Sequence, residues 1–203
     1  MKTLATLLLF FATNAHAGHV LYYSDSIGSA LNGTPTIMDL LLAQRPDLTG
    51  CNDSYPGRDT DDGVTGVQTA MAPGCVGLET DVIVVLGIND PLSVDSDPKE
   101  AAKRLRQIGA KIRAKGAREW LVPPLPCLSN RGLPLDFQEY RRQIRYWLAH
   151  MNGAGVSYNV IDAADEFTET PWDVCAADGV HPAGAAGLPC RQKVADYLAT
   201  VIP

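Results

Sequence analysis

A short apolar run near the middle of the chain restricts the fold more than any other feature. Residues 81 to 86 read Asp-Val-Ile-Val-Val-Leu, and Gly87 follows directly. A run this short and this continuously apolar is typical of a strand whose two faces are both buried, as in a parallel sheet covered by helices. The segment therefore predicts a central strand of an α/β fold.

Strand-like and helix-like segments alternate along the rest of the chain. Further strands are predicted at His19 to Asp25, Cys51 to Tyr55, Trp120 to Val122 and Val156 to Ile161. Helices are predicted at about Pro35 to Pro46, Asp59 to Ala70, Asp97 to Lys115, Phe137 to Met151 and Ala183 to Val201. This alternation predicts a three-layer α/β/α sandwich around a five-stranded parallel sheet. In such folds, ligands bind beyond the carboxyl ends of the strands.

The first 17 residues have the pattern of an export signal. Lys2 gives a positive start, residues 4 to 12 form a short apolar run, and Ala15-His16-Ala17 has the small-x-small pattern of a cleavage site. The alternative, a membrane anchor, would need an apolar run of roughly 20 residues. We therefore expect a signal peptide at 1–17, a periplasmic or secreted protein without stable membrane insertion, and one mature domain at 18–203.

The cysteines fit export to an oxidising compartment. All five lie after the signal segment, at Cys51, Cys75, Cys127, Cys175 and Cys190. No Cys-x-x-Cys pair supports zinc, so disulfides are the expected use. The sequence does not determine their connectivity. We expect Cys51 with Cys75 and Cys175 with Cys190, because each pair flanks a loop that carries candidate site residues, and one thiol is then left over.

The charge of the chain argues against polyanionic partners. There are 17 Lys and Arg against 23 Asp and Glu, and losing Lys2 with the signal leaves a net charge of −7. This charge disfavours nucleic acid or an anionic membrane surface as the main partner. The basic residues between Asp97 and Lys115 could suggest a polyanion site, but we interpret them as a solvated helix face. Small or neutral substrates fit the charge better.

A serine near the start of the mature chain and a histidine near its end could act together. Ser26 follows the first predicted strand, and a serine hydroxyl is a poor nucleophile unless a base activates it. Asp178-Gly179-Val180-His181-Pro182 precedes the last predicted helix. It offers an imidazole as base and a carboxylate to hold the imidazole tautomer. The competing interpretation is an Asp-Gly turn before a helix start, with no catalytic role.

Two further loops offer hydrogen-bond donors for a developing oxyanion. Asn89 stands at the end of the 81–86 strand and could donate from its amide. Gly57 could donate its backbone N–H in a loop that lets a substrate come close, although Gly63 and Gly66 could replace it. Ordinary turns would explain the same residues. The carboxylates from Asp59 on suit a helix start, with a calcium loop as the alternative.

Taken in chain order, Ser26, Gly57, Asn89 and His181 resemble the Ser, Gly, Asn and His blocks of the SGNH, or GDSL, family of serine hydrolases. The resemblance covers nearly all of the chain after residue 17 and is greatest to the compact exported thioesterase and lysophospholipase-like branch. It implies a flavodoxin-like fold, Ser26 as nucleophile, His181 as base and Asp178 as its orienting acid. The N–H groups of Ser26 and Gly57 and the Asn89 amide would form the oxyanion hole.

One position departs from the family pattern. Ser24 stands where the Gly-Asp-Ser motif of the family has glycine, and we expect an adjusted turn with retained activity. Three other residues could lie near the site: Cys127 after the fourth strand, and Trp172 and Tyr23, which core packing explains equally well. His150 is a weaker candidate base because a cation at a helix C-terminus already has a structural reason.

The resemblance implies an exported serine esterase that hydrolyses acyl esters through an acyl-enzyme. It would need no metal or cofactor, and we expect a monomer that acts on a small-molecule, glycan or lipid ester. Removal or transfer of O-acetyl groups on polysaccharide is the alternative that the same site could support. A non-catalytic sugar- or lipid-binding module on the same fold is a further alternative.

Overall fold

The computed structural model describes residues 18–77, 80–93, 97–126, 136–151, 157–167 and 172–203. The expected signal peptide at 1–17 and Cys127 lie outside the described residues, so the statements about them stay predictions. In the described part of the chain, no helix has both the length and the apolar character that crossing a membrane requires.

Within the described residues, four strands form one parallel sheet. They are β1 (Gly18–Ser24), β2 (Leu48–Ser54), β3 (Thr80–Val85) and β4 (Arg118–Val122), in the spatial order β2-β1-β3-β4. All neighbours run parallel, and Ser24 lies opposite both Ser54 and Val85. Every residue of β3 is buried, which confirms the expectation of a strand covered on both faces.

The prediction of a full fifth strand at 156–161 is wrong. Among its described residues, Val160 forms an isolated parallel bridge to Leu121 of β4. The side chains of Arg113 and Glu119 bind the backbone of this segment at 2.6 and 3.0 Å. Backbone groups that are already bonded to side chains cannot extend a strand ladder. The pairing beyond β4 is therefore reduced to a bridge.

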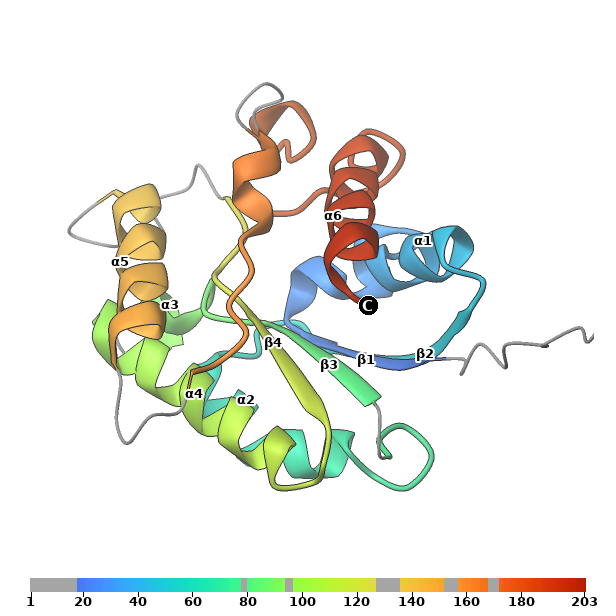
Figure 1. Cartoon of the computed structure of the whole chain (residues 1–203). Coiled ribbons are helices and arrows are strands. Elements are labelled where there is room, and N and C mark those ends of the chain that lie inside the picture. The colour runs from blue at the N-terminus through green and yellow to red at the C-terminus, as the bar shows by residue number, and fades with distance from the viewer. Residues whose placement is uncertain (1–17, 78–79, 94–96, 127–135, 152–156, 168–171) are drawn as a thin grey trace, which may run out of the picture.

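Helices cover both faces of the sheet, which confirms the three-layer α/β/α prediction (Figure 1). In the described residues the α-helices are α1 (Ile37–Gln44), α2 (Thr60–Ala70), α3 (Asp90–Ser93), α4 (Pro98–Arg113), α5 (Phe137–His150) and α6 (Leu188–Val201). The short 3₁₀ helices are η1 (Ser26–Gly28), η2 (Ala30–Asn32), η3 (Ala163–Phe167) and η4 (Trp172–Val174). Helices α1 and α6 pack together on one face, and α4 packs with α2 and α5 on the other.

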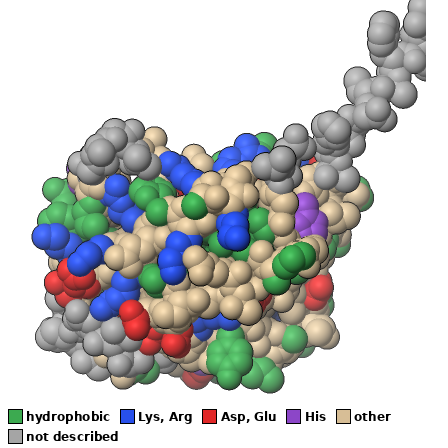
Figure 2. All heavy atoms as spheres, turned by 90° about the horizontal axis from the view of Figure 1, so that it is seen from below, with side chains coloured by type: hydrophobic (Ala, Val, Ile, Leu, Met, Phe, Trp, Pro, Cys, Tyr) green, Lys and Arg blue, Asp and Glu red, His purple; other side chains and the backbone are tan. Residues whose placement is uncertain are grey.

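Helix α4 turns one side to the sheet and the other to solvent. Leu105, Ile108 and Ile112 are fully buried, whereas the Lys103 side chain is 55% exposed. Viewed from below the orientation of Figure 1, the Lys and Arg side chains are interspersed with acidic, apolar and other groups (Figure 2). Among the basic residues between Asp97 and Lys115, Lys99, Lys103 and Lys115 are exposed and the other four are partly buried, so the interpretation as a solvated face holds for part of the set.

The last helix begins later than predicted. Residues 184–187 form turns, Gly184 has a φ of +57°, and α6 starts at Leu188. Glycine is unfavourable inside a helix, whereas Pro189 is tolerated in the first helical turn. Residues 182–187 are consequently a loop between His181 and α6.

Two disulfides join the cysteines in the expected pairs. Cys51 bonds Cys75 and Cys175 bonds Cys190, each with 5.8 Å between the Cα atoms. The second bond joins the segment before Asp178 to α6. A crosslink of this kind restricts the unfolded chain and typically contributes about 2–4 kcal/mol to stability.

Candidate active site

The carboxyl ends of β1 and β3 meet where the connections of the sheet change direction. From β1 the chain goes to β2 on one side, and it later returns to β3 on the other side. At such a switch point the loops diverge, and a crevice opens beyond the strand ends. Ser26 follows β1 and Asn89 follows β3, so the topology places two predicted site residues there.

The turn that carries Ser26 is fixed by hydrogen bonds on both sides of the hydroxyl. Asp25 caps η1 by accepting a hydrogen bond from the Ile27 N–H at 2.9 Å. The Ser26 carbonyl oxygen accepts one from the side-chain amide of Asn32 at 2.6 Å. The direction of the serine side chain is therefore set by short-range backbone contacts.

Ser24 fits into this turn because residue 28 has no side chain. The Ser24 hydroxyl is fully buried, lies 2.8 Å from the Ser54 hydroxyl and donates to the Asp25 carbonyl oxygen at 3.2 Å. A Cβ atom on Gly28 would lie 2.2 Å from Ser24 Oγ. The departure from the family's glycine is thus accommodated by a small hydroxyl that finds polar partners.

The structure brings Ser26, His181 and Asp178 into a continuous row of contacts. Ser26 Oγ lies 3.0 Å from His181 Nε2, and His181 Nδ1 lies 2.6 Å from Asp178 Oδ2. Because a carboxylate can only accept, Nδ1 carries the hydrogen and Nε2 can accept from the serine hydroxyl. Residues that are 155 positions apart in the chain therefore meet in the order that a nucleophile, a base and an orienting acid require.

The carboxylate of Asp178 is kept ionised by its surroundings. Partial burial acts to raise its pKa, but hydrogen bonds from the backbone and ring of His181 and from the Val180 N–H outweigh burial and lower the pKa to about 2. The two backbone bonds measure 2.7 and 2.8 Å. The side chain is still 54% exposed, so the site is open to solvent at this point.

The loop that presents Asp178 and His181 is anchored at several places. Gly179 has a φ of +76°, a left-handed conformation that glycine adopts without strain. The indole N–H of buried Trp172 donates to the Val180 carbonyl oxygen at 3.0 Å. The Cys175–Cys190 disulfide ties the start of the loop to α6.

Gly57 occupies the third position of a turn beyond β2. Its φ is +81°, Pro56 precedes it, and the Arg58 N–H donates to the Tyr55 carbonyl oxygen at 3.2 Å, as in a type II β-turn. The Tyr55 N–H donates to the Ser24 carbonyl oxygen at 3.0 Å and so holds this turn beside the end of β1. The turn's own hydrogen bond does not use the Gly57 N–H.

Asn89 reaches the same turn from β3. Its side-chain amide donates to the Arg58 carbonyl oxygen at 3.0 Å, and an amide nitrogen carries two hydrogens. The alternatives Gly63 and Gly66 lie inside helix α2, where the Gly63 N–H donates to the Asp59 carbonyl oxygen. Gly57 is therefore the glycine of this region that the structure places beside Asn89.

One supporting contact was not predicted from the sequence. Asp90 is fully buried and accepts hydrogen bonds from the N–H and hydroxyl of Thr60, both at 2.7 Å. Burial raises the pKa of Asp90 to about 6. The pair joins the loop after β3 to the start of α2. An Asn-Asp pair at a strand end is a local signal for it, but Thr60, the partner, is 30 residues away.

Several sequence candidates lie elsewhere. His150 ends α5, where its ring stacks on Tyr146 and its Nδ1 contacts the Tyr146 carbonyl oxygen at 2.7 Å. Tyr23 and Trp172 are buried in the core. Asp59 caps α2, as the helix-start interpretation predicts. Among the described residues, no three His, Cys, Asp or Glu side chains gather as a possible metal site.

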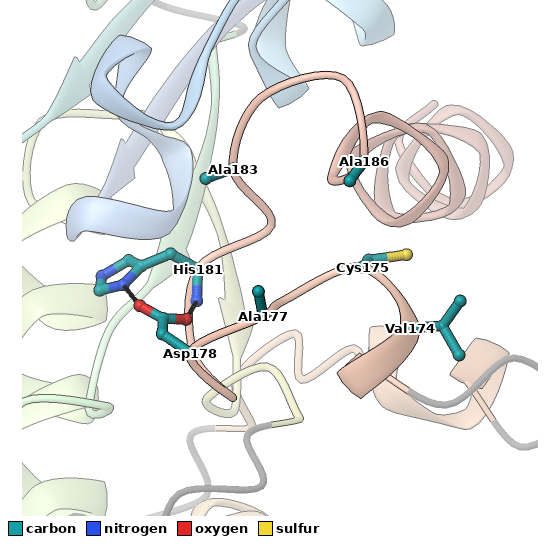
Figure 3. Close-up of a pocket in the computed structure, with 7 residues that line it drawn as sticks. All are labelled: Val174, Cys175, Ala177, Asp178, His181, Ala183 and Ala186. Carbon is teal, nitrogen blue, oxygen red and sulfur yellow. Dashed lines mark hydrogen bonds and ion pairs between the residues drawn. The ribbon is translucent and has the colours of Figure 1, made fainter.

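A cavity of about 290 Å³ adjoins the loop that carries Asp178 and His181. Its lining includes Asp178 and His181 and is otherwise small or apolar, with Val174, Ala177, Ala183 and Ala186. The imidazole and carboxylate groups lie at one end of the cavity, Cys175 and Val174 lie toward the other end, and the turn that carries Ala183 and Ala186 runs along one side (Figure 3). The pocket is thus continuous with the residues that meet Ser26.

A family model described as the GDSL-like lipase/acylhydrolase family matches residues 22–186. The chain belongs to this family. The match spans all four blocks and ends just before α6, and it confirms the resemblance drawn from the sequence. Membership in the GDSL-like lipase/acylhydrolase family makes the chain a carboxylic ester hydrolase.

Solved structures of related proteins share the fold. A lipolytic G-D-S-L family protein from Veillonella parvula is 18% identical, with 91% of this chain and 97% of that chain covered and a TM-score of 0.66. The esterase EstA from Pseudoalteromonas sp. is 16% identical, with 90% and 97% covered and a TM-score of 0.66. An acetyl xylan esterase from Geobacillus stearothermophilus is 18% identical, with 87% and 94% covered and a TM-score of 0.61. A comparison with curated proteins gives no significant match.

Proposed function

We propose that this GDSL-family protein is an exported serine esterase that hydrolyses acyl esters through an acyl-enzyme. The observation that carries the proposal is the row of contacts from Ser26 Oγ through His181 to Asp178, at 3.0 and 2.6 Å. A serine hydroxyl bonded to a neutral imidazole, which a carboxylate orients, is the arrangement that activates serine for attack on a carbonyl carbon.

In the proposed reaction, Ser26 Oγ attacks the ester carbonyl carbon while its proton moves to His181 Nε2. The negative charge that develops on the carbonyl oxygen is stabilised by the N–H groups of Ser26 and Gly57 and by the Asn89 amide. When the tetrahedral intermediate collapses, His181 gives the proton to the leaving alkoxide, and the acyl group stays on Ser26. Water then repeats the sequence and releases the acid.

Replacing Asn89 with alanine should lower kcat by about 10²- to 10³-fold, because one oxyanion donor is lost. KM should change little, since the donor acts on charge that develops only in the transition state. Steady-state kinetics with p-nitrophenyl acetate measure both constants, and thermal unfolding followed by circular dichroism controls for loss of the bond to Arg58. Wild-type turnover in a folded variant would mean that the Asn89 amide serves only the structural bond to Arg58 and does not stabilise the oxyanion.

Export is part of the proposal. The two disulfides support it, because such bonds persist in oxidising compartments and are rare in the cytosol. Cleavage after Ala17 would leave Gly18, the first residue of β1, at the new N-terminus. The mature protein would then begin directly with the strand that leads to Ser26.

Deacetylation or acetyl transfer on polysaccharide remains a second candidate, favoured by the likeness to an acetyl xylan esterase. A single panel separates the candidates: p-nitrophenyl esters with two to twelve acyl carbons, and acetylated xylan with acetate release as the readout. A fluorophosphonate probe, followed by peptide mass spectrometry, tests the serine mechanism. We expect hydrolysis in the panel and labelling on Ser26. An unlabelled, inactive protein would favour the non-catalytic binding module instead.

A further inference from the structure

Arg191 is a buried cation in the first turn of α6, and only 1% of its surface is exposed. Burial lowers its pKa. Its guanidinium donates to four backbone carbonyl oxygens: those of Pro35 (3.1 Å), Asn32 (2.9 Å), Gly184 (3.1 Å) and Pro182. Removing a charge from water is costly unless its donors are satisfied, and these carbonyl groups accept from four of the five N–H donors.

The carbonyl groups belong to two different catalytic loops. Asn32 and Pro35 lie in the segment that follows Ser26, whereas Pro182 and Gly184 lie in the loop that follows His181. One planar guanidinium therefore crosslinks the loop of the nucleophile to the loop of the base. Arginine suits this task because its donors are held in a rigid fork.

Asn32 extends the crosslink to the nucleophile itself. Its side-chain amide donates to the Ser26 carbonyl oxygen at 2.6 Å and to the Ile27 carbonyl oxygen at 3.3 Å. Its own carbonyl oxygen accepts from the Gly184 N–H at 2.8 Å as well as from Arg191. Asn32 is 6% exposed, so water competes little for these bonds. A continuous chain of hydrogen bonds thus runs from the Ser26 backbone to the loop after His181.

We propose that Arg191 and Asn32 are positioning residues that set the separation between Ser26 Oγ and His181 Nε2. The inference rests on the proposed function. The two reacting side chains lie on loops with no shared strand or helix, so their 3.0 Å contact depends on what joins the loops. A displacement of about 1 Å in a catalytic group can cost about 10²-fold in rate, so a crosslink of this kind controls turnover.

The test compares Arg191→Met, Arg191→Lys and Asn32→Ala with wild type. The matched control is Arg141→Met, which removes a buried guanidinium that pairs with Asp162 and, among the described residues, forms no hydrogen bond or ion pair with either catalytic loop. Wild-type hydrolysis of p-nitrophenyl acetate and fluorophosphonate labelling of Ser26 are measured first. All kinetics are run at least 15 °C below the unfolding midpoint of each variant, so that every sample is folded.

We expect Arg191→Met to lower kcat by about 10²-fold and Asn32→Ala by about 10-fold, with KM within about threefold of wild type. Arg191→Lys should recover part of the loss, since an ammonium can still donate to several carbonyl groups. The pH profile gives a readout that a structural role would not move. With the base misplaced, residual turnover should rise in proportion to hydroxide above pH 8, whereas the wild-type rate reaches a plateau. Arg141→Met should lower the unfolding midpoint and keep kcat within twofold.

Wild-type kcat and an unchanged pH profile in Asn32→Ala and in either Arg191 variant would overturn the inference, even if these variants unfold at lower temperature. Should Arg191→Met fail to fold, Arg191→Lys and Asn32→Ala decide the matter with the same readouts. Absence of both hydrolysis and labelling in wild type would refute the proposed function, and the inference would fall with it. Activity in wild type with unaffected variants would refute the inference alone.

Discussion

Replacing Ser26 with alanine should lower kcat for p-nitrophenyl acetate by about 10⁶-fold, which is the scale of loss seen when a catalytic serine is removed. The proposed acyl-enzyme forms at Ser26 Oγ, and no other described hydroxyl contacts His181. The substitution removes one oxygen atom and leaves the backbone bonds of the turn in place. The measurement is steady-state hydrolysis, with background hydrolysis subtracted.

The folded state of Ser26→Ala should match wild type. Alanine fits wherever serine does, and the change breaks a single side-chain contact, so the unfolding free energy should shift by less than about 1 kcal/mol. Thermal unfolding and fluorophosphonate labelling together give the control: a wild-type midpoint with no label on the variant. Activity within tenfold of wild type in this variant would refute the serine mechanism.

Replacing His181 with alanine should reduce kcat by about as much as Ser26→Ala, and the double variant should lose little more, because the members of a triad act as a unit. Asp178→Asn should cost about 10⁴-fold, since an amide can donate to Nδ1 and so favour the wrong tautomer. Single- and double-variant kinetics measure these losses. Additive losses in the double variant would mean that the two residues do not act on one step.

The pH profile provides a further check on Asp178. Its pKa of about 2 lies below the ordinary value, so the carboxylate is charged throughout the range in which the protein can be assayed. In the pH profile of activity, no limb from Asp178 should therefore appear above about pH 3. A carboxylate limb near pH 4 to 5 that vanishes in Asp178→Asn would contradict this assignment.

Local patterns predicted most of the fold. The apolar run of β3 and the amphipathic period of α4 each identify an element that buries its own surface. β2 was weaker as a sequence signal because Leu48–Ser54 mixes polar residues with glycine, and its place at the sheet edge explains why these residues are tolerated. The prediction of a strand at 156–161 was wrong because the backbone of this segment binds the side chains of Arg113 and Glu119. No local sequence pattern indicates these contacts.

The same distinction between local and long-range signals applies to the site residues. Ser26 and the Asp178–His181 pair stand in compact motifs with recognisable chemistry, and the structure brings them together. The contacts that hold the loops in place are formed by Asn32 and Arg191, which are 159 positions apart and have no motif of their own. The sequence alone does not distinguish an arginine that is buried and binds carbonyl groups from an arginine on a solvated helix face. Such supports become visible only when the chain is folded.

Recombinant material made in a reducing cytosol would contain thiols at positions 175 and 190. The Cys175–Cys190 bond joins no strand of the sheet, but without it the loop with the imidazole would be attached to α6 by noncovalent contacts alone. Preparations from the cytoplasm and from an oxidising compartment would then differ in specific activity at equal purity. The compartment in which the protein is expressed therefore affects the specific activity of the purified sample.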